Sequence, residues 1–168
     1  MRMSFTVLIL LFTLILSACT SNDRDLDDAI KVAKEYKTAE LEADQPEPNG
    51  EISMEAIEAK EEAIKPLTNT KFFERNKISR VYSRSSLIAK VRESAIVVSD
   101  LNFTEKHQSE DEIELEYTGL MSFAEEKIEL KGIITLLKEE NEWKVNNDVY
   151  NFEDLIPIID ENIINKER

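Results

Sequence analysis

The spacing of apolar residues changes once along this chain, near residue 95. Before that point apolar residues recur every three or four positions, which is the period of a helix with one buried face. After it apolar and polar residues alternate, which is the period of a half-buried strand. Separate runs of helices and then strands are typical of α+β folds, so we expect N-terminal helices packed on an antiparallel sheet.

The first half of the chain predicts two helices with a loop between them. Asp25–Ala43 has helical spacing and aspartates at its start, where the helix dipole favours negative charge. Gln45–Gly50 contains two prolines and a glycine and predicts an exposed loop. Ser53 is typical of an N-cap and predicts a second helix over Met54–Lys65, ending near Pro66. Its expected inner face comprises Met54, Ile57, Ala63, Ile64 and Leu67.

A shorter helix and a basic segment follow. Thr70 predicts the cap of a helix over Lys71–Asn76, which offers Phe72 and Phe73 to the core. The next segment, Ile78–Arg92, has no single period, but it is the only basic stretch in an acidic chain. We therefore regard it as a candidate partner surface.

The second half predicts four strands joined by short polar turns. The strands are expected over Ala95–Lys106, Glu112–Phe123, Lys127–Glu139 and Glu142–Tyr150. Short turns imply antiparallel neighbours, so the sheet is predicted to be a meander. Gly119 and Gly132 lie inside strands, where glycines often mark bulges or bends, so the sheet is expected to be bent. Asn151–Lys166 predicts a C-terminal helix or flap, broken near Pro157.

Three features together resemble the nuclear transport factor 2-like roll, which is cystatin-like in architecture. They are the segment Leu67–Phe73 after two helices, the meander with its glycines, and Glu142-Trp143-Lys144-Val145 in the last strand. The resemblance covers residues 25–152 and implies a cone-shaped roll with a pocket between sheet and helices. Some members of this family use that pocket for catalysis, and many only bind.

The resemblance also implies where a catalytic site would lie. The resemblance implies that a steroid-isomerase-like site would consist of a tyrosine and two aspartates inside the cone. In this sequence the candidates are Tyr117, Asp100 and Asp148. Asp100 is expected on the pleat face opposite Leu101 and Phe103, and Asp148 lies near a strand end. We therefore predict no catalytic residues.

The N-terminus carries an apolar segment that ends in the only cysteine. Phe5–Leu16 is too short to span a bilayer as a helix, so with Arg2 before it the segment predicts a cleaved secretory signal. The run Leu16-Ser17-Ala18-Cys19 resembles the lipobox of bacterial lipoproteins. That resemblance implies cleavage between Ala18 and Cys19, diacylglycerol on the Cys19 sulfur, and a further acyl chain such as palmitate on the new amino group.

The same resemblance predicts the organisation and location of the chain. Residues 1–18 are the signal peptide, 19–24 a lipid-anchored tether, 25–152 the roll and 153–168 a C-terminal helix or tail. The domain is expected on the extracytoplasmic face of the cell membrane. In a source with two membranes, the outer membrane is the alternative.

Composition excludes several kinds of function. The chain has 21 Lys and Arg against 35 Asp and Glu, a net charge of −14, which argues against nucleic-acid binding. With Cys19 lipidated no thiol remains for a disulfide, a zinc site or a nucleophile. His107 is the only histidine and has no partner motif, and Asp23–Asp28 lacks the glycine and glutamate of an EF-hand. We expect no metal and no cofactor.

Two functions remain open from the sequence. The first is a non-catalytic interaction module that binds an unknown envelope protein through the region of Arg80, Arg84 and Arg92 or through the apolar tail Phe152–Ile164. The alternative is a small-molecule binding protein or enzyme with its pocket inside the cone. The two are distinguished by whether aromatic side chains fill the cone, namely Phe72, Phe73, Tyr117, Phe123 and Trp143.

Overall fold

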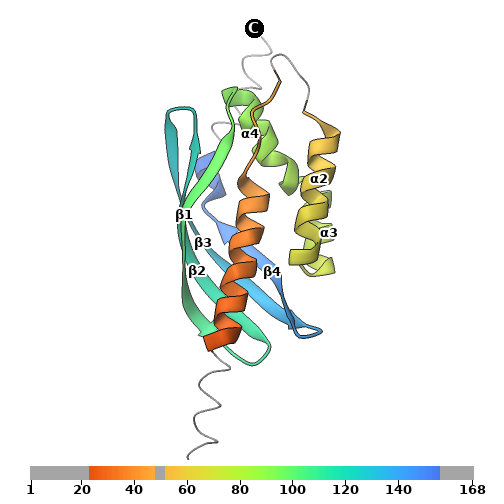
Figure 1. The fold of residues 1–168 in the computed structure, drawn as a ribbon, viewed down its shortest axis with the longest axis vertical. Helices are drawn as coiled ribbons and strands as arrows, with labels where there is room; N and C mark the ends of the chain where they lie inside the picture. The colour runs from red at the N-terminus through yellow and green to blue at the C-terminus, as the bar shows by residue number, and fades with distance from the viewer. Residues whose placement is uncertain (1–22, 48–51, 156–168) are drawn as a thin grey trace, which may run out of the picture.

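Helices cover one face of a four-stranded antiparallel sheet (Figure 1). The computed structural model describes residues 23–47 and 52–155. In this part the strand order is β1-β2-β3-β4, so the α+β class and the meander are confirmed. The strands are β1 (Ile96–Gln108), β2 (Glu112–Phe123), β3 (Glu126–Glu139) and β4 (Glu142–Tyr150).

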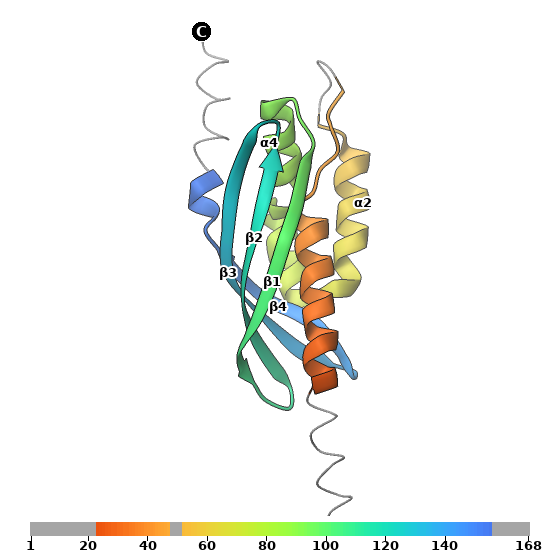
Figure 2. The ribbon, with the colours of Figure 1, turned by 60° about the vertical axis from the view of Figure 1, so that its left-hand side comes forward.

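The N-terminal helix, residues 23–41, lies lengthwise along the sheet, and the later helices lie beside it (Figure 2). The remaining helical elements are α2 (Met54–Ile64), η1 (Lys65–Leu67), α3 (Thr70–Ile78), η2 (Val81–Ser83), α4 (Arg84–Arg92) and η3 (Phe152–Leu155). The predicted signal peptide and Cys19 lie outside the described residues, as does the C-terminal helix or flap beyond residue 155.

One predicted helix cap is confirmed and one is wrong. The Ser53 side chain accepts a hydrogen bond from the backbone N–H of Ala56 at the start of α2. At α3 the cap is Asn69, whose side-chain oxygen accepts from the N–H of Phe72 at 2.8 Å, and Thr70 is already helical. Both residue types can cap a helix, and Asn69 has the extended backbone that a cap requires.

The predicted inner face of α2 is only partly buried: Ile57 and Leu67 are half-buried, whereas Met54 and Ala63 are exposed. Of its residues only Ile64 is buried, and Met54 is 65% exposed. The helical period shows which residues share a face, but it does not show whether another element packs there. The N-terminal half of α2 has no such neighbour, and this leaves space beside it.

A bulge in β1 changes which of its side chains face the core. Asp100 has a φ of 53°, and the pairing with β2 shifts between Ser99 and Asn102. Ile96 packs in the core before the shift, and Leu101 packs against the core after it. Regular alternation would place Ile96 and Leu101 on opposite sides of the sheet, but the extra residue of the bulge reverses the alternation, so both face the core.

One of the two strand glycines marks a bulge. Gly119 lies opposite the bulge of β1, because the pairing of β1 with β2 shifts between Leu120 and Thr118, whereas the pairing of β2 with β3 is continuous through both glycines. Both glycines also allow close approach: a Cβ on Gly119 would lie 2.8 Å from Leu101, and one on Gly132 would lie 2.7 Å from the ring of Tyr117. Gly132 thus leaves room for the Tyr117 ring to lie across the neighbouring strand.

Candidate functional site

Side chains fill the space between the helices and the sheet. The aromatic residues that decide between a filled and an open cone are all buried, each no more than 5% exposed: Phe72, Phe73, Tyr117, Phe123 and Trp143. Phe73 stacks on Tyr82, and Phe103 tilts against Tyr117. The space where the roll resemblance implied a pocket is therefore occupied by aromatic rings.

A buried ion cluster lies between the N-terminal helix and the sheet. Lys37, on the helix, is fully buried. Its Nζ lies 2.6 Å from Glu40 Oε2, one turn further along the helix, and 2.8 Å from Asp148 Oδ2 on β4. This lysine therefore links the helix to the sheet through two carboxylates.

Tyrosine side chains complete the cluster. The Tyr117 hydroxyl donates to Asp148 Oδ1 at 3.0 Å, and the Tyr150 hydroxyl donates to Glu40 Oε1 at 3.3 Å. The Lys37 ammonium lies 3.8 Å from the centre of the Tyr150 ring, close enough for a cation–π contact. Each buried carboxylate is thus bound by one ammonium and one phenol.

Burial shifts the protonation of the cluster. Desolvation raises the pKa of Asp148 to about 6, although the charge of Lys37 partly opposes the shift. Burial alone would lower the pKa of Lys37, but Asp148 and Glu40 outweigh it and hold that pKa above its ordinary value. Burial and the charge of Asp148 also raise the pKa of the Tyr117 phenol. At neutral pH Lys37 is charged and Tyr117 is protonated.

The cluster is tightly packed. A cavity bordered by Glu40 and Tyr150 has a volume of only about 10 Å³, which is about the space for one water molecule. Both oxygens of Asp148 already accept hydrogen bonds, from Lys37 and Tyr117. The arrangement therefore joins the N-terminal helix to the sheet.

The structure brings together two of the three residues considered for an isomerase-like site. Tyr117 and Asp148 are hydrogen-bonded, whereas Asp100 is exposed at the bulge of β1. Lys37 was not selected from the sequence. A signal was present, because Lys37 follows Ala33 by four residues and so lies on the buried stripe of its helix.

A second feature is a surface cavity of about 550 Å³. It lies between the extended segment 42–47, the start of α2, one face of α4 and the start of β1. Lys60 of α2 borders it and donates three hydrogen bonds, to the carbonyl oxygens of Glu40 and Glu42 and to Ser85 Oγ. Burial lowers the pKa of Lys60 to about 8.

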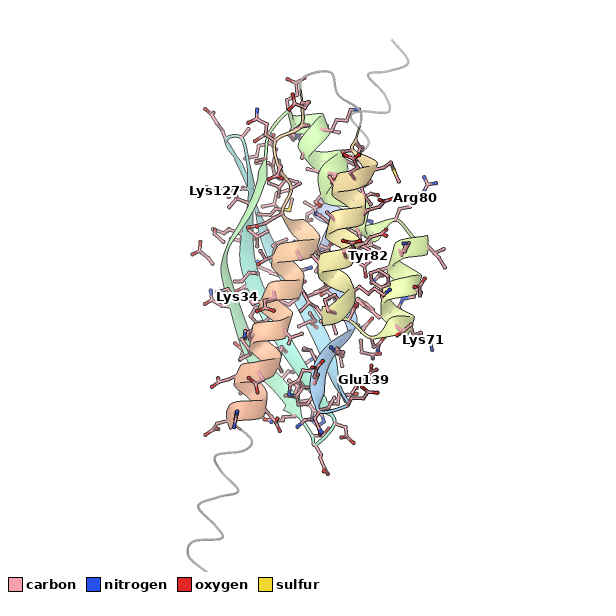
Figure 3. The ribbon with its side chains drawn as sticks, turned by 45° about the vertical axis from the view of Figure 1, so that its right-hand side comes forward. Lys34, Lys71, Arg80, Tyr82, Lys127 and Glu139 are labelled. Atoms are coloured by element: carbon pink, nitrogen blue, oxygen red, sulfur yellow. The ribbon has the colours of Figure 1, made fainter. Side chains whose placement is uncertain are left out.

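The basic residues of the predicted partner surface have different surroundings. Arg84 stacks on the ring of Phe152 at 4.2 Å, and Arg92 forms an ion pair with Glu126 at 3.3 Å. Arg80 is exposed, beside η2 (Figure 3). Of the three arginines that the sequence grouped, Arg80 is thus the most exposed, and Arg84 and Arg92 are half-buried.

Other sequence candidates carry no site in the described residues. His107 is exposed near the end of β1. Residues 23–47 and 52–155 contain no group of His, Cys, Asp or Glu side chains that could hold a metal ion. In the same ranges, no helix is both long and apolar enough to cross a membrane.

The chain fits no protein-family model, and it matches no curated protein. Its function is therefore argued from its own residues.

Proposed function

We propose that this chain is a lipid-anchored extracytoplasmic protein that serves as a non-catalytic interaction module at the cell surface. The observation that carries the proposal is the lipobox-like run Leu16-Ser17-Ala18-Cys19, which ends four residues before residue 23, the first helical residue that the structure describes. Four residues extend to about 14 Å at most. A lipid on Cys19 therefore keeps the start of this helix close to the bilayer.

The placement of the N-terminal helix supports this proposal. Its first residues lie at the same end of the molecule as the β1–β2 and β3–β4 turns (Figure 1), and Lys138 Nζ lies 2.9 Å from both carboxylate oxygens of Asp25. At a rise of about 1.5 Å per residue, the helix over 23–41 is about 28 Å long. The opposite end of the domain is thus directed away from the membrane.

We propose that the partner is an envelope protein with an acidic surface. The corner where α3 meets η2 combines an exposed basic residue, Arg80, with Ile78, which is 80% exposed. The whole chain is strongly acidic, so this corner is a local departure from the charge of the chain. An exposed cation beside an exposed apolar side chain fits a partner that offers carboxylates around an apolar contact.

Substitution of Cys19 tests the anchor. We expect the wild type and a matched Thr20→Ala variant to incorporate labelled palmitate and to sediment with membranes. Cys19→Ala should lose the label and should either appear in the medium or remain as uncleaved precursor. A Cys19→Ala chain that is processed to mature size and still sediments with membranes refutes the proposal.

A further inference from the structure

We propose that the surface cavity binds a compact apolar molecule carrying a single carboxylate. Its volume of about 550 Å³ is within the range of small-ligand sites. It opens at the end of the N-terminal helix that is remote from residue 23, since segment 42–47 follows that helix directly. The inference does not depend on Cys19.

The cavity exists because segment 42–47 and α2 contact their neighbours over only part of their length. Segment 42–47 pairs with β1 at one position, where the Ala43 N–H donates to the Ile96 carbonyl at 3.2 Å and the Ile96 N–H donates back at 2.8 Å. Beyond Ala43, residues 44–47 make no backbone hydrogen bond to another backbone group in the described chain. The exposed N-terminal half of α2 forms the facing wall without closing the space.

The lining supplies an apolar surface. Ala43, Ile52, Ala56, Ile96 and Val97 all border the cavity. Val97 is 54% exposed, although β-branched side chains in strands usually pack against neighbouring side chains. Covering this side chain with the apolar part of a ligand removes apolar surface from water, which favours binding.

The lining also supplies an unpaired cation and a hydroxyl. Ser86 and Lys90 border the cavity from α4, where a spacing of four residues places them on one face. Both are half-buried, and within residues 23–47 and 52–155 neither side chain has a hydrogen bond or an ion pair. An ammonium with a hydroxyl one turn away can bind a carboxylate through charge-assisted hydrogen bonds.

Other charged groups on the rim restrict the ligand to one negative charge. The ammonium of Lys60 already donates three hydrogen bonds, which is all that it has. Glu42 Oε1 accepts from the Val98 N–H at 3.3 Å, and the side chains of Asp44 and Glu47 are exposed at the rim. These three carboxylates disfavour a doubly charged phosphate, whereas Lys90 can neutralise a single carboxylate.

Methyl NMR of the full chain in a non-ionic detergent tests the site. The first arm compares hexanoate with hexanamide, and the second compares N-acetyl-alanyl-leucine with its C-terminal amide. We expect an acid to shift the methyl signals of Ala56, Ile96 and Val97, and its amide to bind at least about tenfold more weakly, since a charged hydrogen bond is lost. Whichever of the two acids binds more tightly shows whether the carboxylate ligand is a free small acid or a peptide C-terminus.

Variants separate the site from general binding to an acidic chain. Lys90→Gln should weaken binding of the acid by about tenfold, and Ser86→Ala should weaken its binding less. Lys71→Gln on α3 is the matched control, because Lys71 is an exposed helical lysine at the far side of the domain (Figure 3). Acid and amide that bind equally, a control that weakens binding as much as Lys90→Gln, or an absence of shifts in both arms would each overturn the proposal.

Discussion

Replacing Lys37 with methionine tests whether the buried ion cluster joins the N-terminal helix to the sheet. The substitution keeps a long apolar stem but removes the ammonium that lies within 3 Å of both Glu40 Oε2 and Asp148 Oδ2. The two carboxylates then remain buried with phenols as their remaining partners. Removing one member of a buried pair typically costs about 3–5 kcal/mol of unfolding free energy.

That loss is a large part of the stability of a domain of this size, which is on the order of 5–15 kcal/mol. The assay is urea unfolding at pH 7.5 of the chain in a non-ionic detergent, followed by the fluorescence of Trp143, the only tryptophan and a buried one. Lys34→Met is the matched control: Lys34 lies on the same helix but is exposed (Figure 3). It should change stability by less than about 0.5 kcal/mol.

A triple variant shows whether the loss comes from unpaired charge. Lys37→Met combined with Glu40→Gln and Asp148→Asn removes all three charges and keeps polar groups near Tyr117 and Tyr150. We expect it to recover most of the loss, because neutral groups cost less to bury than charges. The reasoning is refuted if Lys37→Met costs no more than Lys34→Met, or if the triple variant is no more stable than Lys37→Met.

Two further predictions concern pH and partner binding. Because the pKa of Asp148 is raised to about 6 in the folded state, the folded chain gains a proton as the pH falls, so this group contributes more stability at pH 5 than at pH 7.5. Asp148→Asn should reduce the difference in unfolding free energy between pH 5 and pH 7.5 by about 1 kcal/mol, as measured by urea unfolding. The same pH dependence in the wild type and in Asp148→Asn would contradict this prediction. Arg80→Glu should reduce cross-linking of the chain to its envelope partner in whole cells, while Lys71→Glu should not; unchanged cross-linking in both would exclude the corner as the contact.

The sequence predicted the sheet well because its pattern is local. The predicted limits of Glu112–Phe123 and Glu142–Tyr150 agree with β2 and β4. In a strand with one buried face, each apolar residue reports its own environment, so strand limits follow from alternation alone. The alternation holds in β2 of the structure, where Ile113 and Met121 are both buried.

The errors arose where a local pattern depends on distant neighbours. Asp100 reads as an ordinary polar strand residue, and only the pairing with β2 reveals the bulge that reverses the faces of β1. Met54 has helical spacing with Ile57 and Ile64, but no element packs over it. In both cases the deciding information lies in another segment of the chain.

The candidate sites depend still more on tertiary structure. Lys37 and Asp148 are 111 residues apart in sequence, and nothing in the spacing of either residue indicates the other. Tyr117 could be paired with Asp148 only through the roll resemblance, which did not include the lysine. Likewise the sequence marked Ile78–Arg92 as basic without showing that Arg84 and Arg92 are engaged while Lys90 borders a cavity.

The sequence by itself determined the class of this protein: an acidic chain with one cysteine behind a short apolar segment, whose periodicity requires helices followed by an antiparallel meander. Periodicity suffices for this because it reflects which face of each element avoids water. Only the tertiary structure decided that aromatic side chains fill the space between helices and sheet, that a buried lysine joins helix to sheet, and that a cavity opens beside α4. Those features depend on how closely segments from distant parts of the chain approach one another, which no local pattern records.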